Sequence, residues 1–294
     1  MDVNDLKLFE AVARLGVMNR AATELNTVQS NVTARIRAME TSLGQALFIR
    51  HGKGVRLTEA GERLLPFARR LPALVDDAVR AVRDNGTPRG QLVIGSLETT
   101  AALHLTPALA EFVSAHRQVD LTLRTGTTEE LVAATLERRL EGAFVCGPIA
   151  HPELREDAIF REELVALTAP SVSSFDHLVR AGDVRMIVLR AGCSYRHRLQ
   201  VLLARRGITA PRMLEFGTLE AIMGCVSAGL GVTLLPRAMI KPPWTARRIR
   251  THRLPPADAQ ADTVFIRPRD GTPSSAMRAF LSHVTDTIVR RRVA

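Results

Sequence analysis

The chain of 294 residues has few cysteines and few aromatic side chains. Its cysteines, Cys146, Cys193 and Cys225, lack metal-ligand spacing, so we predict neither a disulfide framework nor a metal site. Aromatic residues make up only 4% of the sequence, which disfavours a surface that binds sugars or single-stranded nucleic acid by stacking. No nucleotide-binding fingerprint occurs either, and we expect no cofactor.

Long apolar runs are also missing. No run of about 18 apolar residues occurs, and the first 20 residues carry acids in place of the apolar segment of a signal peptide. We therefore expect a soluble, cytoplasmic protein with no membrane partner. Because 46% of the residues are apolar, the chain can bury sizeable cores, and its length favours two or more domains.

Acidic residues are outnumbered, and the net charge of +10 favours polyanionic partners. Residues 1–88, however, carry 13 basic and 10 acidic side chains, so the overall charge does not locate a nucleic-acid site. Between Arg35 and Arg56 the balance is different, with five basic residues and a single acid, Glu40. Basic charge is therefore concentrated in this part of the amino-terminal region.

Apolar spacing near the amino terminus predicts two short helices. The first is expected over residues 5–15 and is ended by Gly16. The second is expected over residues 19–25, with Asn19 as its cap and a turn at Asn26. Two helices that meet through a tight turn, with small alanines at their crossing, are typical of a helix-turn-helix.

A third helix is predicted between Thr27, its expected cap, and Gly44. Its apolar residues step by four, three and four, and they are Val32, Ile36, Met39 and Leu43. The other faces carry short hydrogen-bonding side chains and arginine, where an ordinary surface helix favours Glu and Lys. Residues 48–50 and 55–57 are expected to pair as a hairpin with Lys53 at its tip, which is a wing.

A winged helix-turn-helix inserts its third helix into the major groove of DNA. Gln, Ser, Asn, Thr and Arg side chains there read base edges or bind phosphates, and basic wing residues follow the backbone. The predicted DNA-binding residues are Gln29, Ser30, Asn31, Thr33, Arg35, Arg37, Arg50 and Lys53. The alternative is a polar, solvated face on a small helical domain.

A long helix is predicted after Thr58, which can cap it. Its apolar residues step 4-3-4-3-4, as in the seam of a coiled coil, and they are Leu64, Ala68, Leu71, Val75, Ala78 and Val82. Pro66 and Pro72 each remove a helical hydrogen bond, so we expect a kinked helix. The alternative to pairing with a second chain is that this stripe packs on its own domain.

Strand-like runs alternate with helical runs beyond the turn-rich segment 85–90. The strand-like runs are 91–95, 119–125, 143–147, 164–168, 186–190, 231–236 and 263–267. This alternation predicts parallel sheets in α/β units, with a ligand at the carboxyl ends of the strands.

Hydroxyl side chains gather at several of the expected strand-to-helix turns, where free N–H groups favour an anion, commonly a carboxylate. We therefore predict a small organic acid or an amino-acid-like ligand. The predicted ligand-binding residues are Ser96, Thr99, Thr100, Thr125, Thr127, Ser194, Tyr195, Arg196 and Thr218. Plain helix capping is the alternative for each Ser or Thr, and the nearby Glu215 could pair with or reject a charged ligand.

Motifs along the whole chain resemble those of the LysR-type transcriptional regulators. The similarity runs through LKLFEAVARLG, RAATELN, VQSNVTARIRAMETSLG and LFIRHGKGVRLTEAG, and it continues to the carboxyl end. It implies an α/β fold class with an N-terminal winged helix-turn-helix, a long linker helix and a two-lobed, periplasmic-binding-protein-like effector domain. The expected boundaries are 1–58 for the DNA-binding domain, 59–88 for the linker and dimerisation helix, 89–161 with 268–294 for lobe I, and 162–267 for lobe II.

The resemblance implies a sequence-specific regulator, not an enzyme, whose partners are double-stranded operator DNA and a small-molecule effector. It also implies a homodimer paired through the linker helices and a tetramer built from two dimers; RNA polymerase is a further candidate partner. The DNA-contacting positions of the family fall on Gln29, Ser30, Asn31, Thr33, Arg35 and Lys53. Many relatives have arginine at the position of Ala34, where this chain has Arg35 next in sequence.

Three other functions stay open at this point. Peroxide-sensing members of the family use a cysteine one position after Cys193, where this chain has Ser194, and a redox-responsive regulator acting through Cys193 is the first alternative. An enzyme with Cys193 or Ser194 as nucleophile is the second, although the histidines form no recognisable relay. A transport solute-binding protein fits the second half of the chain but not the winged domain.

Overall fold

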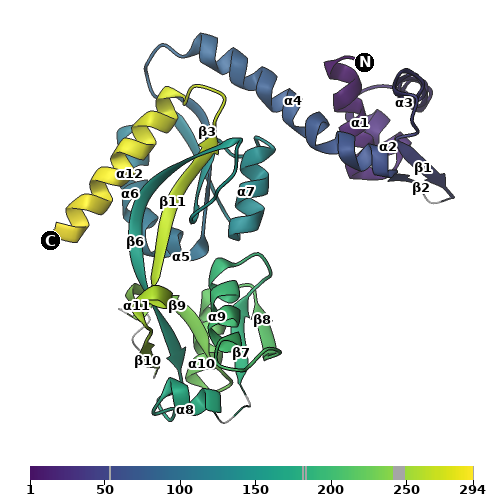
Figure 1. Cartoon of the computed structure of the whole chain (residues 1–294). Coiled ribbons are helices and arrows are strands. Elements are labelled where there is room, and N and C mark those ends of the chain that lie inside the picture. Colours follow the sequence, from purple (N-terminus) through teal and green to yellow (C-terminus); the bar gives the residue numbers. More distant parts are fainter. Residues whose placement is uncertain (53, 181, 183, 241–248, 294) are drawn as a thin grey trace. The chain divides into compact units, whose positions relative to one another are not determined.

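The computed structural model describes residues 1–52, 54–180, 182, 184–240 and 249–293. The chain divides into two compact units, which are Met1–Asn85 with Leu136–Arg139, and Gly86–Thr135 with Leu140–Ala294. The first unit holds α1 (Val3–Leu15), α2 (Met18–Glu24), α3 (Gln29–Leu43), β1 (Phe48–His51), β2 (Gly54–Leu57) and α4 (Glu59–Arg83). Figure 1 labels the helices and strands of both units.

The first three helices and the hairpin β1–β2 enclose a small core. Phe9 and Val12 of α1, Ala21 of α2 and Ile36 of α3 are all fully buried in it. Gly16 ends α1 in the left-handed conformation with φ +66°, as predicted, and its carbonyl oxygen accepts a hydrogen bond from the Val55 N–H at 2.8 Å. The wing is therefore attached to the end of the first helix.

Two of the predicted helix caps are wrong, and one is confirmed. Helix α2 begins after Val17 and α3 after Val28, and neither of these residues makes a side-chain capping bond. The Thr27 hydroxyl instead accepts a hydrogen bond from the Asn31 side-chain amide at 2.9 Å. Thr58 does cap α4, since its hydroxyl accepts from the Gly61 N–H at 3.1 Å.

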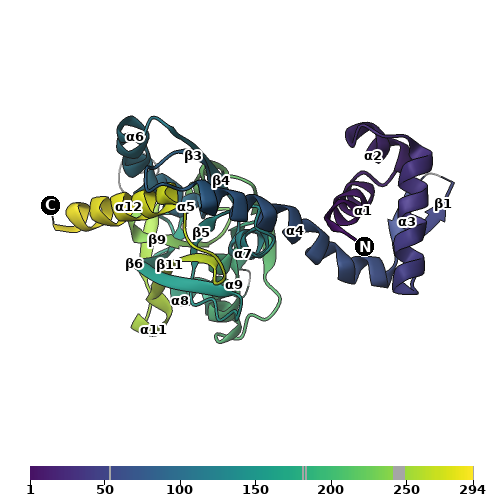
Figure 2. The ribbon, with the colours of Figure 1, turned by 90° about the horizontal axis from the view of Figure 1, so that it is seen from above.

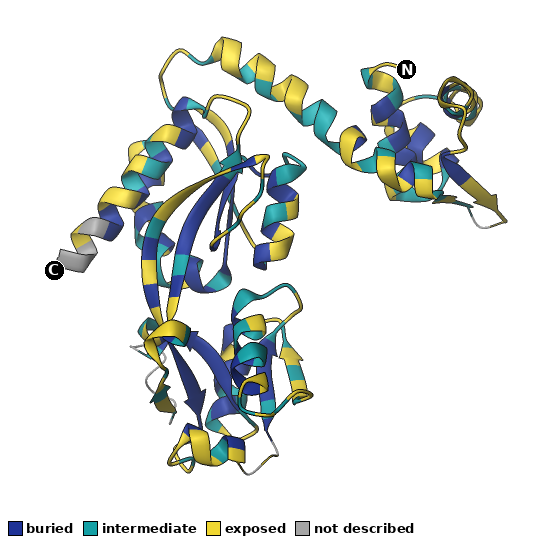
Figure 3. Cartoon of the chain, in the orientation of Figure 1, coloured by how far each residue is buried: buried dark blue, intermediate teal, exposed yellow. Residues whose placement is uncertain are grey.

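Helix α4 continues through Pro66 and Pro72 over its 25 residues. Its apolar stripe serves two purposes. The first part packs on its own domain, where Ala68 is buried and Leu64 and Leu71 contact the core. The later part is uncovered: Val75 and Val82 are 41% and 89% exposed. Figure 3 shows this exposure along the second half of the helix.

The second unit is built on a seven-stranded mixed sheet with the order β10-β6-β11-β5-β3-β4, in which β9 also pairs with β6. Its strands are β3 (Gly90–Ser96), β4 (Val119–Thr125), β5 (Gly142–Cys146), β6 (Leu154–Thr168), β9 (Thr233–Pro236), β10 (Arg250–Arg253) and β11 (Gln260–Pro268). A separate parallel pair consists of β7 (Arg185–Leu189) and β8 (Arg212–Phe216).

Helical segments connect these strands. They are α5 (Glu98–Thr100), the π-helix η1 (Ala101–Leu105), α6 (Thr106–Ala115), α7 (Thr128–Leu136), α8 (Phe175–Arg180), α9 (Ser194–Ala204), α10 (Leu219–Ser227), the 3₁₀-helix η2 (Arg237–Ile240), α11 (Pro256–Ala259) and α12 (Ser275–Val293). Helices α6 and α12 lie on one side of the sheet and α7 on the other (Figures 1 and 2). No helix in the described ranges is long and apolar enough to cross a membrane.

The prediction of parallel sheets is confirmed for part of the main sheet and wrong for the rest. Strand β3 pairs in parallel with β4 and β5, but β11 is antiparallel to both β5 and β6. The reason is that the chain leaves the sheet through β6 and returns through β11. Strand β6 is long enough to pair with β11 over Leu154–Glu163 and then with β9 and β10 over Leu164–Thr168.

These two long strands are shared by two lobes, which we call lobe I and lobe II. Lobe I contains β3, β4 and β5 with α6, α7 and α12, and lobe II contains β7 to β10 with α8 to α10. The aromatic core of lobe I includes Phe144 and Phe265, whose ring centroids are 4.8 Å apart, and Phe112 and Phe280, 5.2 Å apart. Figure 1 shows β6 and β11 running from one lobe into the other.

Candidate functional site

One face of α3 is packed into the domain, and the opposite face is polar and open. Val32, Ile36 and Met39 are buried, whereas the predicted DNA-binding residues Gln29, Ser30, Asn31 and Arg37 are exposed and Thr33 is half-buried. Arg50 is exposed on the wing strand β1. The side chains of Gln29 and Ser30, in the first turn of α3, make no hydrogen bond to other described residues. The start of α3 is therefore free to contact a partner.

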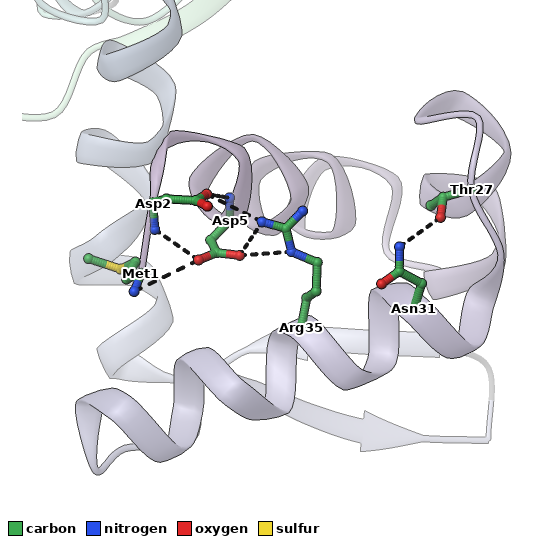
Figure 4. Close-up of polar contacts among 6 residues, drawn as sticks. All are labelled: Met1, Asp2, Asp5, Thr27, Asn31 and Arg35. Carbon is green, nitrogen blue, oxygen red and sulfur yellow. Dashed lines mark hydrogen bonds and ion pairs between the residues drawn. The ribbon is translucent and has the colours of Figure 1, made fainter.

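Arg35 projects from the same side of α3 as Asn31, one turn further along, and its side chain is held by aspartates (Figure 4). Its Nε donates to Asp5 Oδ1 at 2.8 Å, and its Nη2 donates to Asp2 Oδ1 at 3.3 Å, so the side chain reaches from α3 to the start of α1 (Figure 4). Burial alone would raise the pKa of Asp5, but the Asp2 N–H and the Arg35 guanidinium together lower it. Arg35 therefore ties α3 to the start of α1, and the DNA contact predicted for it stays a prediction.

Asn31 and Lys53 complete the set of predicted DNA-binding residues. Asn31 is exposed; its side-chain amide is oriented by its bond to Thr27, and its side-chain carbonyl oxygen makes no hydrogen bond to the other described residues (Figure 4). Lys53, the expected tip of the wing, lies outside the described residues. Among the described residues, the open face of α3 and Arg50 therefore carry the candidate nucleic-acid interface.

A second candidate site is a cleft between lobe I and lobe II, at the carboxyl ends of β3, β4 and β7. Lobe I lines it with Leu97, Glu98, Thr99, Thr125, Gly126 and Thr127, and lobe II lines it with Leu189, Arg190, Cys193, Ser194 and Tyr195. This is the sheet edge at which α/β proteins bind ligands. The position agrees with the rule used to predict the ligand site from the strand pattern.

Five of the nine predicted ligand-binding residues lie together in this cleft, namely Thr99, Thr125, Thr127, Ser194 and Tyr195. The other four do not line it. The Ser96 hydroxyl donates to the Leu97 carbonyl, Thr100 is buried beside the cleft, and Thr218 caps α10. Arg196 forms an ion pair with Glu215 at 2.5 Å. The charged residues Glu98 and Arg190 line the cleft but were not predicted from the sequence.

The cleft is narrow because the lobes bind each other across it. The Ser194 hydroxyl donates to Thr128 Oγ1 at 2.9 Å, and the Glu98 carboxylate accepts a hydrogen bond from the Leu219 N–H at the start of α10. The volume open to the centre of a water molecule is about 30 Å³, which is room for about two waters. A larger ligand therefore enters only when the lobes separate and these contacts break.

A buried hydrogen-bonded cluster of Glu162, Tyr195 and His104 connects the cleft to strand β6, one of the two strands that link the lobes. Glu162 of β6 is 7% exposed; its Oε2 accepts from the Tyr195 hydroxyl at 3.2 Å, and its Oε1 lies 2.8 Å from His104 Nε2. Burial, followed by the negative charge of Glu162, raises the pKa of Tyr195 well above its ordinary value, so Tyr195 stays protonated as a donor. His104 lies in the π-helix η1, a type of segment that is frequent at functional sites.

The thiols beside the cleft are poorly suited to nucleophilic or redox chemistry. Cys146 is buried and Cys193 partly buried, and burial raises the pKa of both thiols. Because the thiolate is the reactive species, a raised pKa lowers reactivity at neutral pH. The structure therefore favours neither the redox-responsive alternative nor the nucleophile alternative.

We expect Cys193 in the folded protein to react with iodoacetamide at pH 7 more slowly than in the urea-unfolded chain, because less thiolate is present. The rate should rise with pH, since the raised pKa moves thiolate formation to more alkaline values. Peptide mass spectrometry measures the modification, and Cys193→Ser identifies the peptide. Equal rates in the folded and unfolded chain at pH 7 would contradict the assignment of a protonated thiol.

A helix-turn-helix with an open polar face, joined to a two-lobed domain with a cleft between its lobes, defines a class of ligand-controlled DNA-binding regulators. Residues 3–62 match the family described as "Bacterial regulatory helix-turn-helix protein, lysR family", and residues 85–288 match the "LysR substrate binding domain". The chain belongs to the LysR family, and it is a DNA-binding transcriptional regulator, not an enzyme.

Individual relatives agree with this assignment over nearly the whole chain. The HTH-type transcriptional regulator GltR of Bacillus subtilis is 40% identical over 286 residues, which are 97% of each chain. Among solved structures, ArgP from Mycobacterium tuberculosis has a TM-score of 0.68 at 19% identity, covering 98% of this chain and 97% of its own. Full-length CbnR, solved with its target DNA, has a TM-score of 0.64 at 23% identity, covering 98% and 100%. The two structures share the fold.

Proposed function

We propose that this regulator reads promoter DNA with the first turns of α3 and that a small organic acid or an amino-acid-like effector controls it through the cleft. The observation that supports the first part is the free, exposed pair Gln29 and Ser30 above a buried apolar face. Side chains of this kind at the start of a recognition helix reach base edges, while Arg37 and Arg50 can bind phosphates. A regulator of promoter DNA acts in the cytoplasm.

The effector acts by shifting an equilibrium between arrangements of the two lobes. In the arrangement described here, the bond between Ser194 and Thr128 and the bond between Glu98 and Leu219 hold the cleft nearly closed. A ligand that occupies the cleft has to replace these contacts with its own, and so favours a different separation of the lobes. That change is passed to the DNA-binding domains, which act on bent DNA.

The second half of the α4 stripe supports a homo-oligomer. Val75, Val79 and Val82 are 41%, 44% and 89% exposed, which is unusual for large aliphatic side chains repeated along one helix. Pairing of this face with the same face of a second chain would bury it and give a twofold protein for a roughly palindromic site. We propose a homodimer paired through α4, from which a tetramer can be built.

The DNA-binding proposal predicts a large effect from one substitution. Genomic fragments captured by the purified protein supply the operator, and fluorescence anisotropy measures its affinity. Gln29→Ala should weaken operator binding by about tenfold or more, because a bidentate base contact contributes about 1–3 kcal/mol of discrimination. Binding of unrelated DNA should change little, since phosphate contacts dominate it.

Ser42→Ala is the matched control, because Ser42 is exposed in the last turn of the same helix. It should leave operator affinity unchanged. An operator affinity of the Gln29→Ala protein equal to that of the unmodified protein would show that α3 does not read the bases with its first turn. Failure to retain any promoter fragment at low ionic strength would remove the proposal entirely.

A further inference from the structure

The cleft is lined by one acidic and one basic side chain, Glu98 and Arg190, which do not form an ion pair with each other. Glu98 lines the cleft, and no lysine, arginine or histidine among the described residues lies within ion-pairing distance of its carboxylate. Arg190 acts on Glu98 from farther away, and its own nearest carboxylate is that of Glu130, at 3.9 Å. Glu220 adds a further negative charge near Glu98. The carboxylate of Glu98 therefore has a cation in its surroundings, Arg190, but no ion pair among the described residues.

Partial burial makes the unpaired carboxylate of Glu98 energetically unfavourable. It is the main cause of a raised pKa at Glu98, and the proximity of Glu220 adds to it. The single backbone N–H of Leu219 leaves other lone pairs of the carboxylate without a donor. A charged group in this position is stabilised by a cation that brings its own N–H donors.

Thr99 supplies a second, independent sign that a ligand belongs here. It lines the cleft and is 2% exposed; no hydrogen bond of ordinary geometry satisfies its hydroxyl within the described parts of the chain, and its polar neighbour is the Tyr195 hydroxyl, whose pKa it lowers. Buried hydroxyl groups without a partner are rare and destabilising. Because Thr99 directly follows Glu98, one bound polar group can satisfy the Thr99 hydroxyl while another meets the Glu98 carboxylate.

The residue predicted to hold an anion is not available to do so. Arg196 is paired with Glu215 and does not line the cleft, so Arg190 is the cationic side chain that remains in the lining. An effector that carries only negative charge would be attracted by Arg190 but repelled by the unpaired carboxylate of Glu98. A molecule that carries both a positive and a negative charge can pair with Glu98 and Arg190 at the same time.

We propose that the effector carries a protonated amine, that Glu98 binds this amine, and that Arg190 with the Thr99 hydroxyl binds the carboxylate or another polar group of the same molecule. The effector class is then an amino acid or a closely related amine, not a plain organic acid. This inference rests on the proposed effector control. The free space of the closed cleft, about 30 Å³, is the size of an ammonium group with one water, so the rest of the effector requires separated lobes.

The test compares compounds that differ only in the amine. The full-length protein is titrated by calorimetry with L-amino acids and, in parallel, with the deaminated acid of the same carbon skeleton, for example L-glutamate with glutarate and L-alanine with propionate. We expect at least one amino acid to bind about tenfold or more tightly than its deaminated partner, because a hydrogen bond between charged groups is lost.

Glu98→Gln, which keeps the shape and removes the charge, should reduce the affinity for that amino acid about tenfold or more. Glu98→Asp, which keeps the charge, should retain part of it. Glu111→Gln, at an exposed position on α6, is the matched control and should bind as the unmodified protein does. Thermal melting verifies that each variant is folded.

The outcomes separate this inference from the proposed function. Deaminated acids that bind as tightly as the amino acids, or more tightly to Glu98→Gln than to the unmodified protein, would overturn the amine proposal while leaving effector control intact. If no compound of either series binds or alters operator affinity, both the amine proposal and effector control are wrong.

Discussion

Replacing Gly61 with alanine should destabilise the DNA-binding domain by about 3 kcal/mol, because the added methyl group has no space. A Cβ at Gly61 would lie 2.3 Å from the Leu47 carbonyl oxygen and 2.8 Å from a methyl carbon of Leu57. The Leu47 backbone cannot easily retreat. Its oxygen accepts from the Thr58 N–H at 3.0 Å, and its N–H donates to Glu40 Oε1 at 2.8 Å. The clash would therefore separate α4 from the start of the wing.

Hydrogen exchange of the full-length protein, read in peptides covering α1 and α3, measures this effect locally. Gly61→Ala should speed exchange in these peptides by about a hundredfold, which corresponds to 3 kcal/mol, and should also weaken operator binding. Gly52→Ala is the matched control, because a Cβ there would meet no atom within 4 Å and the position is in the wing of the same domain. If the two variants exchange at the same rate, the contact between Gly61 and the Leu47 backbone is less tightly packed than the structure indicates.

Replacing Glu162 with alanine should destabilise the effector domain by about 3 kcal/mol or more, because two polar groups lose one shared partner. The hydroxyl of Tyr195, which is 5% exposed, would be left in the interior without its acceptor. His104 would lose its contact at 2.8 Å. Glu162→Gln, which keeps an acceptor and the shape, should cost less than Glu162→Ala.

Glu163→Ala is a close control, since Glu163 is the next residue of β6 but is 46% exposed and pairs with the exposed Arg237. Exposed ion pairs contribute about 0–1 kcal/mol, so this variant should melt nearly as the unmodified protein does. Melting of the full-length proteins followed by circular dichroism provides the comparison. Similar melting temperatures for Glu162→Ala and Glu163→Ala would show that the buried group does not hold the lobes.

The DNA-binding unit could be predicted from the sequence almost completely, because its structure is set by local signals. The apolar steps of Val32, Ile36 and Met39 define α3, and glycines in the left-handed conformation end α1 and α3 at Gly16 and Gly44. The caps were harder to predict. Asn19 and Thr27 have capping side chains, but packing sets the helix starts one or two residues away from the predicted positions.

Strands with apolar runs were predicted in the effector half, and strands with charged residues were missed. Strand β4 was predicted at its exact bounds, whereas β8 and β10, with the sequences RMLEF and RTHR, lack a continuous apolar run. The first ten residues of β6, LREDAIFREE, were missed because one of their faces is exposed and charged. Antiparallel pairing of β11 depends on the path of the chain between lobes, which no local pattern encodes.

The contrast between local sequence patterns and tertiary arrangement also explains which cleft residues could be predicted. Thr99, Thr125 and Ser194 could be predicted because hydroxyl groups follow strand ends, where the fold places ligands. Glu98 and Arg190 were missed because a charged side chain in a turn has no periodic signal. Arg196 of α9 and Glu215 of β8 are separated by 19 residues, and their pairing depends on tertiary packing that no local pattern encodes.

Every residue of β11 has a partner on β6, with a shift in register between Thr263 and Val264. The two crossings between lobes are therefore one hydrogen-bonded ribbon, and neither behaves as an independent flexible tether. Stretching or shearing such a ribbon breaks the hydrogen bonds between its strands, whereas twisting keeps them, so we expect twisting to be the easiest relative motion of the two lobes. The proposed effector would then need to favour one direction of rotation.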